Sequence, residues 1–90
     1  MKNILYLSLI KKWFDLIASG KKKVEYREIK PFWKKRLFDK EYDIIHFRNG
    51  YQPDSPLLVV EFKGVGYGYF EGKKHYAIKL GKILKTKFLR

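Results

Sequence analysis

The residue types best suited to binding or catalysis lie together in one segment, Gly20–Arg27, which reads GKKKVEYR. If this segment enters a strand, Glu25 and Arg27 project to the same side, roughly 7 Å apart. A carboxylate stays ionised beside a guanidinium and orients it for a phosphate or a base edge. Lys22 has the opposite parity in an ideal strand, so it joins the pair only if the chain is still turning after Gly20. The spacing leaves open a phosphate-binding site and a solvated basic strand, whose surface ion pair contributes less than about 1 kcal/mol.

Positive charge dominates the whole chain, with 21 Lys and Arg against nine Asp and Glu in 90 residues, a net charge of +12. Residues 1–40 carry twelve basic and four acidic side chains, and residues 63–90 carry eight basic and one acidic. Residues 41–62 are different, with one basic and four acidic side chains. A surface built from the two basic segments attracts polyanions. The lysines are not gathered on one amphipathic helix, so the pattern favours a nucleic acid over a membrane surface.

Length and composition exclude several classes of protein. Ninety residues are expected to form a single domain, 1–90, with one modest core. No cysteine is present, which excludes a disulfide framework and a thiolate zinc site, and two isolated histidines do not make a metal site. The longest near-apolar run, Ile4–Ile10, is too short to span a membrane, and no cleavage site follows it. We therefore expect a cytoplasmic protein without a cofactor.

Two short helices are expected around the charged segment. Apolar side chains from Ile10 to Ile17 recur at the spacing of one helical face, which places Trp13 in the core. Ser8 is the expected N-cap of this helix, and Gly20 suits the left-handed position that ends it. The second helix, residues 31–38, begins with a proline at its first turn and carries Trp33, which either packs in the core or reaches the site.

The remaining segments have the character of strands. Glycines at 64, 66 and 68 alternate along the longest of them, which leaves a bare trough on one face or marks a bulge or bend. Gly81 is expected to end a strand, and the segment after it is either a further strand or a helical tail. About six strands and two short helices predict an α+β fold, a small and partly closed β-barrel with helical insertions. The expected strands are 4–9, 22–28, 43–48, 57–70, 75–80 and 82–90.

The charged segment resembles the G-x-K-x-x-E-x-R motif of the ASCH domain family, with Gly20, Lys22, Glu25 and Arg27 at the four motif positions. The segments SLIKKWFDLIASG, YREIKPFWKKRL, FRNGY and GVGYG are also similar to ASCH proteins, so the resemblance covers roughly residues 4–81. It implies a PUA-like β-barrel with a helix after the first strand and a cleft beside the motif strand. It also implies RNA binding, often in connection with translation or RNA modification.

The first functional hypothesis is a small RNA-binding module. The resemblance implies that Gly20 shapes the loop at the cleft and that the other motif residues line it. In this hypothesis Glu25 holds Arg27 and accepts a hydrogen bond from a base, while Tyr51, at a loop tip, stacks on an unpaired base. The partner is a single-stranded or structured non-coding RNA. The residues expected to bind it are Lys21, Lys22, Lys23, Glu25, Arg27 and Tyr51.

The second hypothesis is an RNA-directed hydrolase with Lys22 and Glu25 as catalytic residues. One branch of ASCH-like proteins hydrolyses N4-acetylcytidine with a Lys at the position of Lys22 and a Thr nucleophile at the position of Glu25. The one Thr of this chain is Thr86, far away in the sequence, which disfavours that reaction. Another branch resembles metal-independent ribonucleases, which need a base for the 2′-hydroxyl and an acid for the leaving oxygen. The candidates for these roles are Lys22, Glu25, Tyr26, His46 and His75.

A third hypothesis is a protein-interaction domain. In it the acidic stretch Glu41–Glu61 contacts a basic partner, since this stretch interrupts the positive charge of the chain. Retention of that partner after nuclease treatment would distinguish such a domain from an RNA-binding module.

Overall fold

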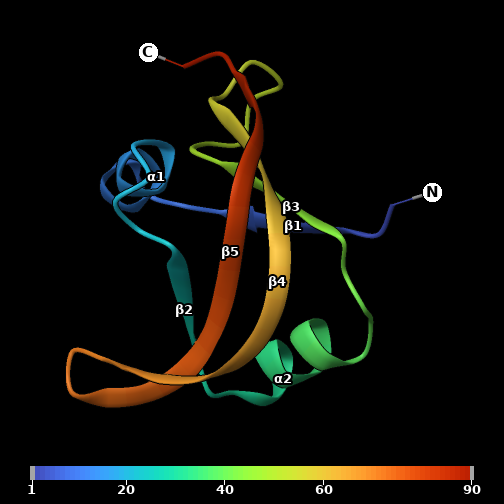
Figure 1. The fold of residues 1–90 in the computed structure, drawn as a ribbon, viewed down its shortest axis with the longest axis vertical. Coiled ribbons are helices and arrows are strands. Elements are labelled where there is room, and N and C mark those ends of the chain that lie inside the picture. The colour runs from blue at the N-terminus through green and yellow to red at the C-terminus, as the bar shows by residue number, and fades with distance from the viewer. Residues whose placement is uncertain (1, 90) are drawn as a thin grey trace.

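The structure, a computed structural model, describes residues 2–89 as two helices and one five-stranded mixed sheet (Figure 1). The elements are β1 (Ile4–Ser8), α1 (Lys11–Ala18), β2 (Val24–Glu28), α2 (Pro31–Phe38), β3 (Ile44–Arg48), β4 (Leu57–Phe70) and β5 (Lys73–Lys87). The strand order is β1-β3-β4-β5-β2, so β1 and β2 are the two edges of the sheet. β1 runs parallel to β3, and the other neighbouring pairs are antiparallel.

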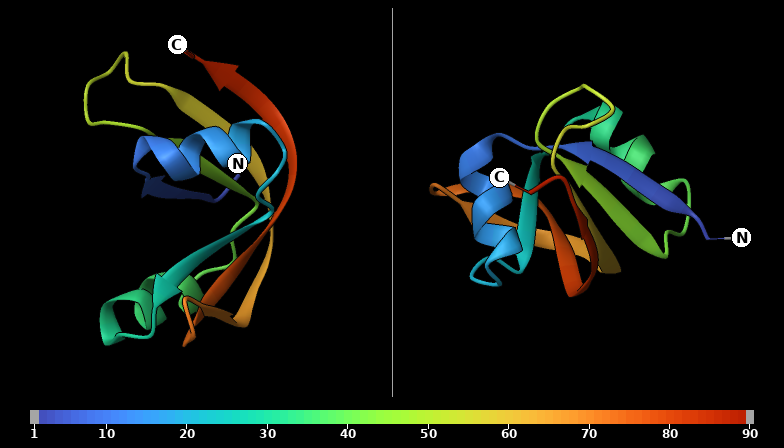
Figure 2. Two further views of the ribbon diagram at one scale, coloured as in Figure 1. Left: turned by 90° about the vertical axis from the view of Figure 1, so that its left-hand side faces the viewer. Right: turned by 90° about the horizontal axis from the view of Figure 1, so that it is seen from above.

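The expected α+β class is confirmed, but strand pairing does not close a barrel. The long strands β4 and β5 are bowed, and α1 and α2 lie near opposite ends of the hollow side of the bow (Figure 2). Register shifts between Val59 and Val65 interrupt the ladder of β4, and Gly64 lies in this stretch with a φ of +115°. Other residues are strained at this φ, so Gly64 marks the bulge that the glycine pattern offered as one interpretation. Within residues 2–89, the sheet is open between β1 and β2.

The core lies between the sheet and the two helices. α1 contributes Phe14 and Ile17, which are three residues apart on one helical face and are buried. α2 contributes Leu37, and the alternation of β1 turns Leu5 and Leu7 inward. Burying one such side chain stabilises the fold by roughly 1.5–3 kcal/mol. These buried side chains fix α1 and α2, the two helices that flank β2 in the sequence, against the sheet. The other strands add Ile45, Phe47, Leu58, Val60, Tyr76, Ile78 and Leu80.

β5 runs without interruption through Gly81, so the prediction that this glycine ends a strand is wrong. A Cβ atom at Gly81 would lie 2.7 Å from Oε1 of Glu61, and the backbone N–H of Lys82 donates to the same oxygen at 2.8 Å. Gly81 therefore lets a side chain of β4 approach the backbone of β5 while the ladder continues on both sides. The two expected segments form a single strand, which reduces the number of strands from six to five. Residue 90 of the second segment lies outside the described residues.

Both predicted helices are present, with eight residues each. Pro31 opens α2 as expected, because its fixed φ and missing N–H suit the first turn. The N-cap of α1 is Ile10, which has an extended backbone and makes no side-chain capping bond, so the prediction of Ser8 as the cap is wrong. Ser8 instead ends β1. Over the described chain, neither helix is long and apolar enough to cross a membrane.

Candidate functional site

The turn between α1 and β2 decides where Lys22 points. Gly20 has a φ of +80°, the left-handed conformation that glycine adopts without strain, and its N–H donates to the carbonyl of Ile17. The N–H groups of Lys21 and Lys22 both donate to the carbonyl of Leu16, at 3.0 Å. These bonds form a Schellman motif, and β2 starts only at residue 24. Lys22 is therefore still in the turn, which is the condition under which it can join Glu25 and Arg27.

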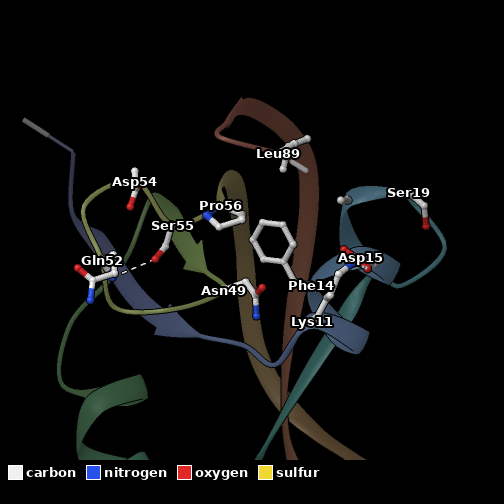
Figure 3. A pocket seen from close by; sticks show the side chains of 11 residues that line it. Lys11, Phe14, Asp15, Ser19, Asn49, Gln52, Asp54, Ser55, Pro56 and Leu89 are labelled. Atoms are coloured by element: carbon white, nitrogen blue, oxygen red, sulfur yellow. Dashed lines mark hydrogen bonds and ion pairs between the residues drawn. The ribbon is translucent and has the colours of Figure 1, made fainter.

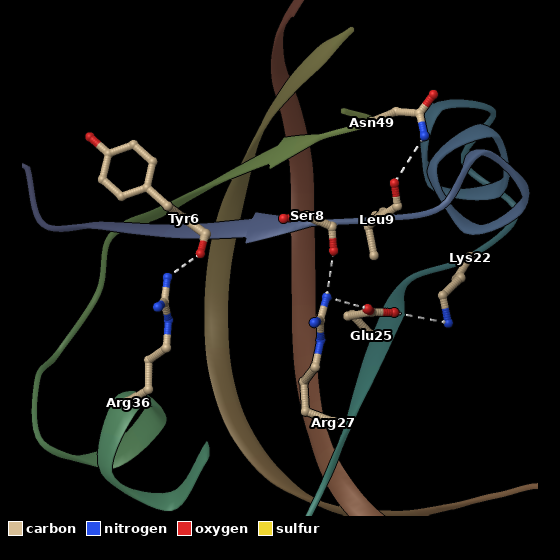
Figure 4. A network of polar contacts seen from close by, with 8 residues as sticks. All are labelled: Tyr6, Ser8, Leu9, Lys22, Glu25, Arg27, Arg36 and Asn49. Carbon is tan, nitrogen blue, oxygen red and sulfur yellow. Dashed lines mark hydrogen bonds and ion pairs between the residues drawn. The ribbon is translucent and has the colours of Figure 1, made fainter. Parts of the chain in front are cut away.

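Glu25 lies between the two cations of the motif (Figure 4). Its Oε2 accepts a hydrogen bond from Nη2 of Arg27 at 2.9 Å, and its Oε1 lies 3.6 Å from Nζ of Lys22. Glu25 is 5% exposed, and a carboxylate so deeply buried needs such partners to stay charged. The expected convergence of Glu25 and Arg27 is present, and the cluster keeps one positive charge in excess.

The ammonium group of Lys22 is also surrounded by aromatic rings. It lies 5.0 Å from the ring centroid of Trp13, 5.1 Å from that of Tyr26 and 5.9 Å from that of Phe70. Tyr26 stacks on Phe70 with a centroid separation of 5.2 Å. Trp13 is half-buried: it packs against the core, as expected, and also faces Lys22. These cation–π contacts hold the lysine at the site even though it belongs to no strand.

The glycine face of β4 is covered at Gly68 by a side chain of the protein itself. A Cβ atom at Gly68 would lie 3.1 Å from Cε1 of Tyr26 and 3.4 Å from Cβ of Ala77. Gly66 has open space at the same place. Gly68 thus provides the surface on which Tyr26 lies, and it helps to set the ring that contacts Lys22.

Arg27 links the two edges of the sheet. Its Nη2 donates to the backbone carbonyl of Ser8 on β1 at 3.0 Å, in addition to its bond with Glu25. Its guanidinium carbon lies 4.9 Å from the ring centroid of Trp33, so this tryptophan reaches the site from α2. One side chain therefore joins the edges β1 and β2, which strand pairing leaves open.

Arg36 is a further arginine that contacts β1 and Trp33, and the sequence did not single it out. Its Nη2 donates to the carbonyl of Tyr6, two residues before Ser8 on β1 (Figure 4). Its guanidinium carbon lies 5.9 Å from the ring centroid of Trp33. Its spacing of three residues from Trp33 on α2 places both side chains on one helical face. This spacing could have predicted that Arg36 lies beside Trp33, but nothing in the sequence indicated that this face of α2 meets β1.

The motif residues Glu25 and Arg27 line a hollow of about 330 Å³. This volume is at the lower end of the ~300–1,000 Å³ typical of small-ligand sites. Lys22 does not line it directly but contacts three of the rings that do. The hollow therefore combines aromatic walls with a buried, charged cluster. Its lining residues are Ser8, Leu9, Ile10, Trp13, Glu25, Tyr26, Arg27, Glu28, Trp33, Phe70 and His75.

His75 is the histidine that the fold brings to this hollow. Its Nδ1 lies 2.7 Å from the carbonyl oxygen of Lys73, which can only accept, so Nδ1 is the donor of this hydrogen bond and Nε2 is the other ring nitrogen. His46 lies elsewhere, on β3. Burial lowers the pKa of His46, and the charges of Arg48 and Lys85 lower it further.

The other predicted residues lie around the hollow or away from it. Lys21 and Lys23 are exposed in the segment before β2, and Lys23 lines a different hollow together with Gly20 and Lys22. Tyr51 is 90% exposed and lines a different hollow. Thr86 lies on β5 opposite Leu58, beyond the segment 75–79 that pairs with β2. The fold therefore brings together Lys22, Glu25 and Arg27, with Tyr51 and Thr86 outside this group.

A hollow of about 610 Å³, larger than the motif hollow, lies between α1 and the loop 49–56 (Figure 3). Lys11, Asp15 and Asp54 line it, so it carries both signs of charge, and no motif residue contributes to it. Another hollow, of about 600 Å³, is lined by Gly20, Lys22 and Lys23 together with residues of β4 and β5. The motif residues therefore border two hollows, and size alone does not identify the site. Among residues 2–89, no group of three or more histidines and carboxylates could hold a metal ion.

Comparison with protein families gives a match to the ASCH domain over residues 7–80. The matched range begins in β1, contains all of Gly20–Arg27, and ends in β5. No curated protein and no solved structure matches the chain.

Proposed function

The chain belongs to the ASCH domain family, and from this membership together with the geometry of the motif we propose that it binds RNA in the hollow beside β2. Membership of the family suggests RNA binding in general. The observation that carries the more specific proposal is the convergence of Lys22, Glu25 and Arg27 beside an aromatic-lined hollow.

Each motif residue has a distinct part in this proposal. Arg27 has five N–H donors, and within residues 2–89 its hydrogen bonds to Glu25 and Ser8 use only Nη2, so other donors are left for a phosphate or a base. Glu25 orients both cations. The exposed Lys21 and Lys23 lie just before the motif strand β2, where their charges attract the RNA backbone. The rings that line the hollow are surfaces on which an unpaired base stacks.

The test compares two lysine variants with the same loss of charge, Lys22→Gln and Lys2→Gln. Affinity for a single-stranded RNA is measured by fluorescence anisotropy at one salt concentration, and circular dichroism checks that both variants fold. We expect Lys22→Gln to weaken binding about tenfold, or about 1.4 kcal/mol. Lys2→Gln, which changes an exposed residue before β1, should weaken binding much less. Equal effects of the two substitutions would remove the motif from the binding site.

A second candidate function, cleavage of RNA, is favoured by the position of His75. In this mechanism Nε2 of His75 accepts the proton of a 2′-hydroxyl, whose oxygen attacks the adjacent phosphorus. Lys22, held by Glu25, donates a proton to the 5′-oxygen that leaves. Hydrolysis of acetylcytidine is not proposed, because Glu25 offers no hydroxyl nucleophile and Thr86 lies outside the motif cluster.

Cleavage is tested by incubating labelled single-stranded RNA with the protein in the presence of a chelator. Products that disappear in His75→Ala, while RNA binding remains, would support the nuclease. A wild-type protein that binds RNA without forming products leaves RNA binding as the function.

A further inference from the structure

A second hollow adjoins the motif hollow on β1. It has a volume of about 340 Å³, and the two hollows share Ser8 as a lining residue. The second hollow is lined by residues of β1, α2, β3 and the following loop, none of which belongs to the motif. Its polar and aromatic lining consists of Tyr6, Ser8, Arg36, His46, Arg48 and Tyr51.

The free edge of β1 connects the two hollows. The backbone carbonyls of β1 point alternately toward β3 and away from it. Those of Tyr6 and Ser8 point to the edge that does not pair with β3. Arg36 binds the first carbonyl and Arg27 binds the second (Figure 4). Two residues of a strand span roughly 6.6 Å, which is the separation of these positions along β1. Two guanidinium groups therefore follow each other along β1. Neighbouring nucleotides of an extended single-stranded RNA can match their spacing.

The two arginines have further features in common. Both contact Trp33, at 4.9 Å for Arg27 and 5.9 Å for Arg36. In both, Nε is buried and has no hydrogen-bond partner within residues 2–89. Each hollow thus contains one arginine with an unused donor, which an acceptor on a ligand can satisfy if the guanidinium reorients.

The second hollow has the chemistry of a nucleotide site. Nη1 of Arg48 donates to the carbonyls of Ser55 at 3.0 Å and Pro53 at 3.3 Å, which fastens the loop that carries Tyr51. Tyr51 is 90% exposed, and its ring is available for stacking. Tyr6 is also exposed, and its ring meets that of His46 edge to face at 5.3 Å. Exposed rings beside two guanidinium groups suit a base with its phosphate.

We propose that a single-stranded RNA occupies both hollows, running along the free edge of β1. One nucleotide lies in the motif hollow, the next phosphate passes Ser8 between Arg27 and Arg36, and the neighbouring base stacks on Tyr51. The inference rests on the proposed RNA binding and adds that at least two adjacent, unpaired nucleotides are recognised. A continuous duplex does not fit this path, because its bases are not free to enter separate hollows.

The test measures binding of a 5′-phosphorylated mononucleotide and of a tetranucleotide to the full chain. The wild-type protein should bind the tetranucleotide more tightly. Tyr51→Ala should weaken tetranucleotide binding about tenfold and leave mononucleotide binding unchanged, because stacking is lost only in the second hollow. Tyr51→Phe should restore most of the lost affinity. Tyr51 is so exposed that the substitution removes no core contact.

Tyr69→Ala is the matched control, since Tyr69 is 73% exposed on β4 and lines neither hollow. Equal tetranucleotide affinities of Tyr51→Ala and Tyr69→Ala would overturn the second subsite, as would a wild type that binds the two ligands equally. Both results leave the proposed function intact. A wild type that binds neither the tetranucleotide nor longer single strands would overturn the proposed function, and the inference with it.

Discussion

At the scale of single residues, the buried carboxylate of Glu25 supplies the counter-charge for Lys22 and Arg27. Its two oxygens face Lys22 and Arg27, and both of these side chains are themselves largely buried. Glu25→Gln removes the negative charge and leaves two buried cations without their counter-charge. We expect the free energy of unfolding to fall by about 3 kcal/mol, measured by urea denaturation.

The matched control for this prediction is Glu28→Gln on the same strand. Glu28 lies 3.5 Å from Lys30, and both side chains are more than half exposed. Loss of this exposed ion pair should lower the free energy of unfolding by less than about 1 kcal/mol. If the two substitutions have equal effects on stability, the ion cluster at Glu25 does not stabilise the fold.

His46 gives the protein a pH-dependent stability. Its pKa in the folded protein is lowered from 6.5 by burial first, and then by Arg48 and Lys85. The unfolded chain therefore binds more protons as the pH falls below about 6.5, so this contribution to stability is present above that pH and is lost below it. The free energy of unfolding should decrease between pH 7.5 and pH 5.5. In His46→Gln the decrease should be smaller, and an unchanged decrease in urea denaturation would contradict the prediction.

The residue types predicted the convergence of Glu25 and Arg27 but not the other contacts around them. The left-handed Gly20 follows from glycine chemistry, and the shared side of Glu25 and Arg27 follows from strand parity. The contact of Arg27 with the carbonyl of Ser8 could not be predicted. It joins two strands that are distant in the sequence and that pair with other neighbours, so no local pattern records it.

At the scale of elements, two glycines of β4 have different roles. Gly68 lies under the ring of Tyr26, whereas Gly66 has open space at the position of a Cβ atom. Gly66→Ala should be neutral or stabilising by about 0.5 kcal/mol, because alanine restricts the unfolded chain. Gly68→Ala should be less stable than Gly66→Ala and should bind RNA more weakly, since the added methyl group displaces Tyr26 from beside Lys22.

The measurements for this pair are thermal unfolding and RNA affinity of both variants. The comparison isolates the contact with Tyr26, because the two glycines lie two residues apart on the same face of β4. A Gly68→Ala variant equal to Gly66→Ala in stability and affinity would show that the Tyr26 ring does not depend on that contact.

Periodicity predicted most elements, and its errors have identifiable causes. The two helices and the first four strands lie close to their expected positions. Gly81 was misinterpreted, because a glycine can end a strand or admit a neighbouring side chain, and the sequence does not show that Glu61 lies opposite. Ser8 suited an N-cap by residue type, but β1 extends to it. In both cases a contact with another strand overrides the local preference.

At the scale of the whole molecule, the charge of +12 determines how the protein should respond to salt. Each phosphate that the basic side chains neutralise releases counterions, so the logarithm of affinity for single-stranded RNA should fall with the logarithm of salt concentration. The slope is about −0.7 per phosphate, so contact with two phosphates gives about −1.4. Anisotropy titrations at several salt concentrations measure this slope, and an affinity independent of salt would exclude electrostatic binding.

Strand order has a consequence for synthesis on the ribosome. β2, which carries Glu25 and Arg27, is an edge strand whose hydrogen-bonded neighbour is β5. The chain emerges from its N-terminus, so the motif strand leaves the exit tunnel long before Lys73–Lys87 can pair with it. Until then Glu25 and its two cations stay in water. The nascent domain therefore completes the pairing of its motif strand late, once β5 has been released.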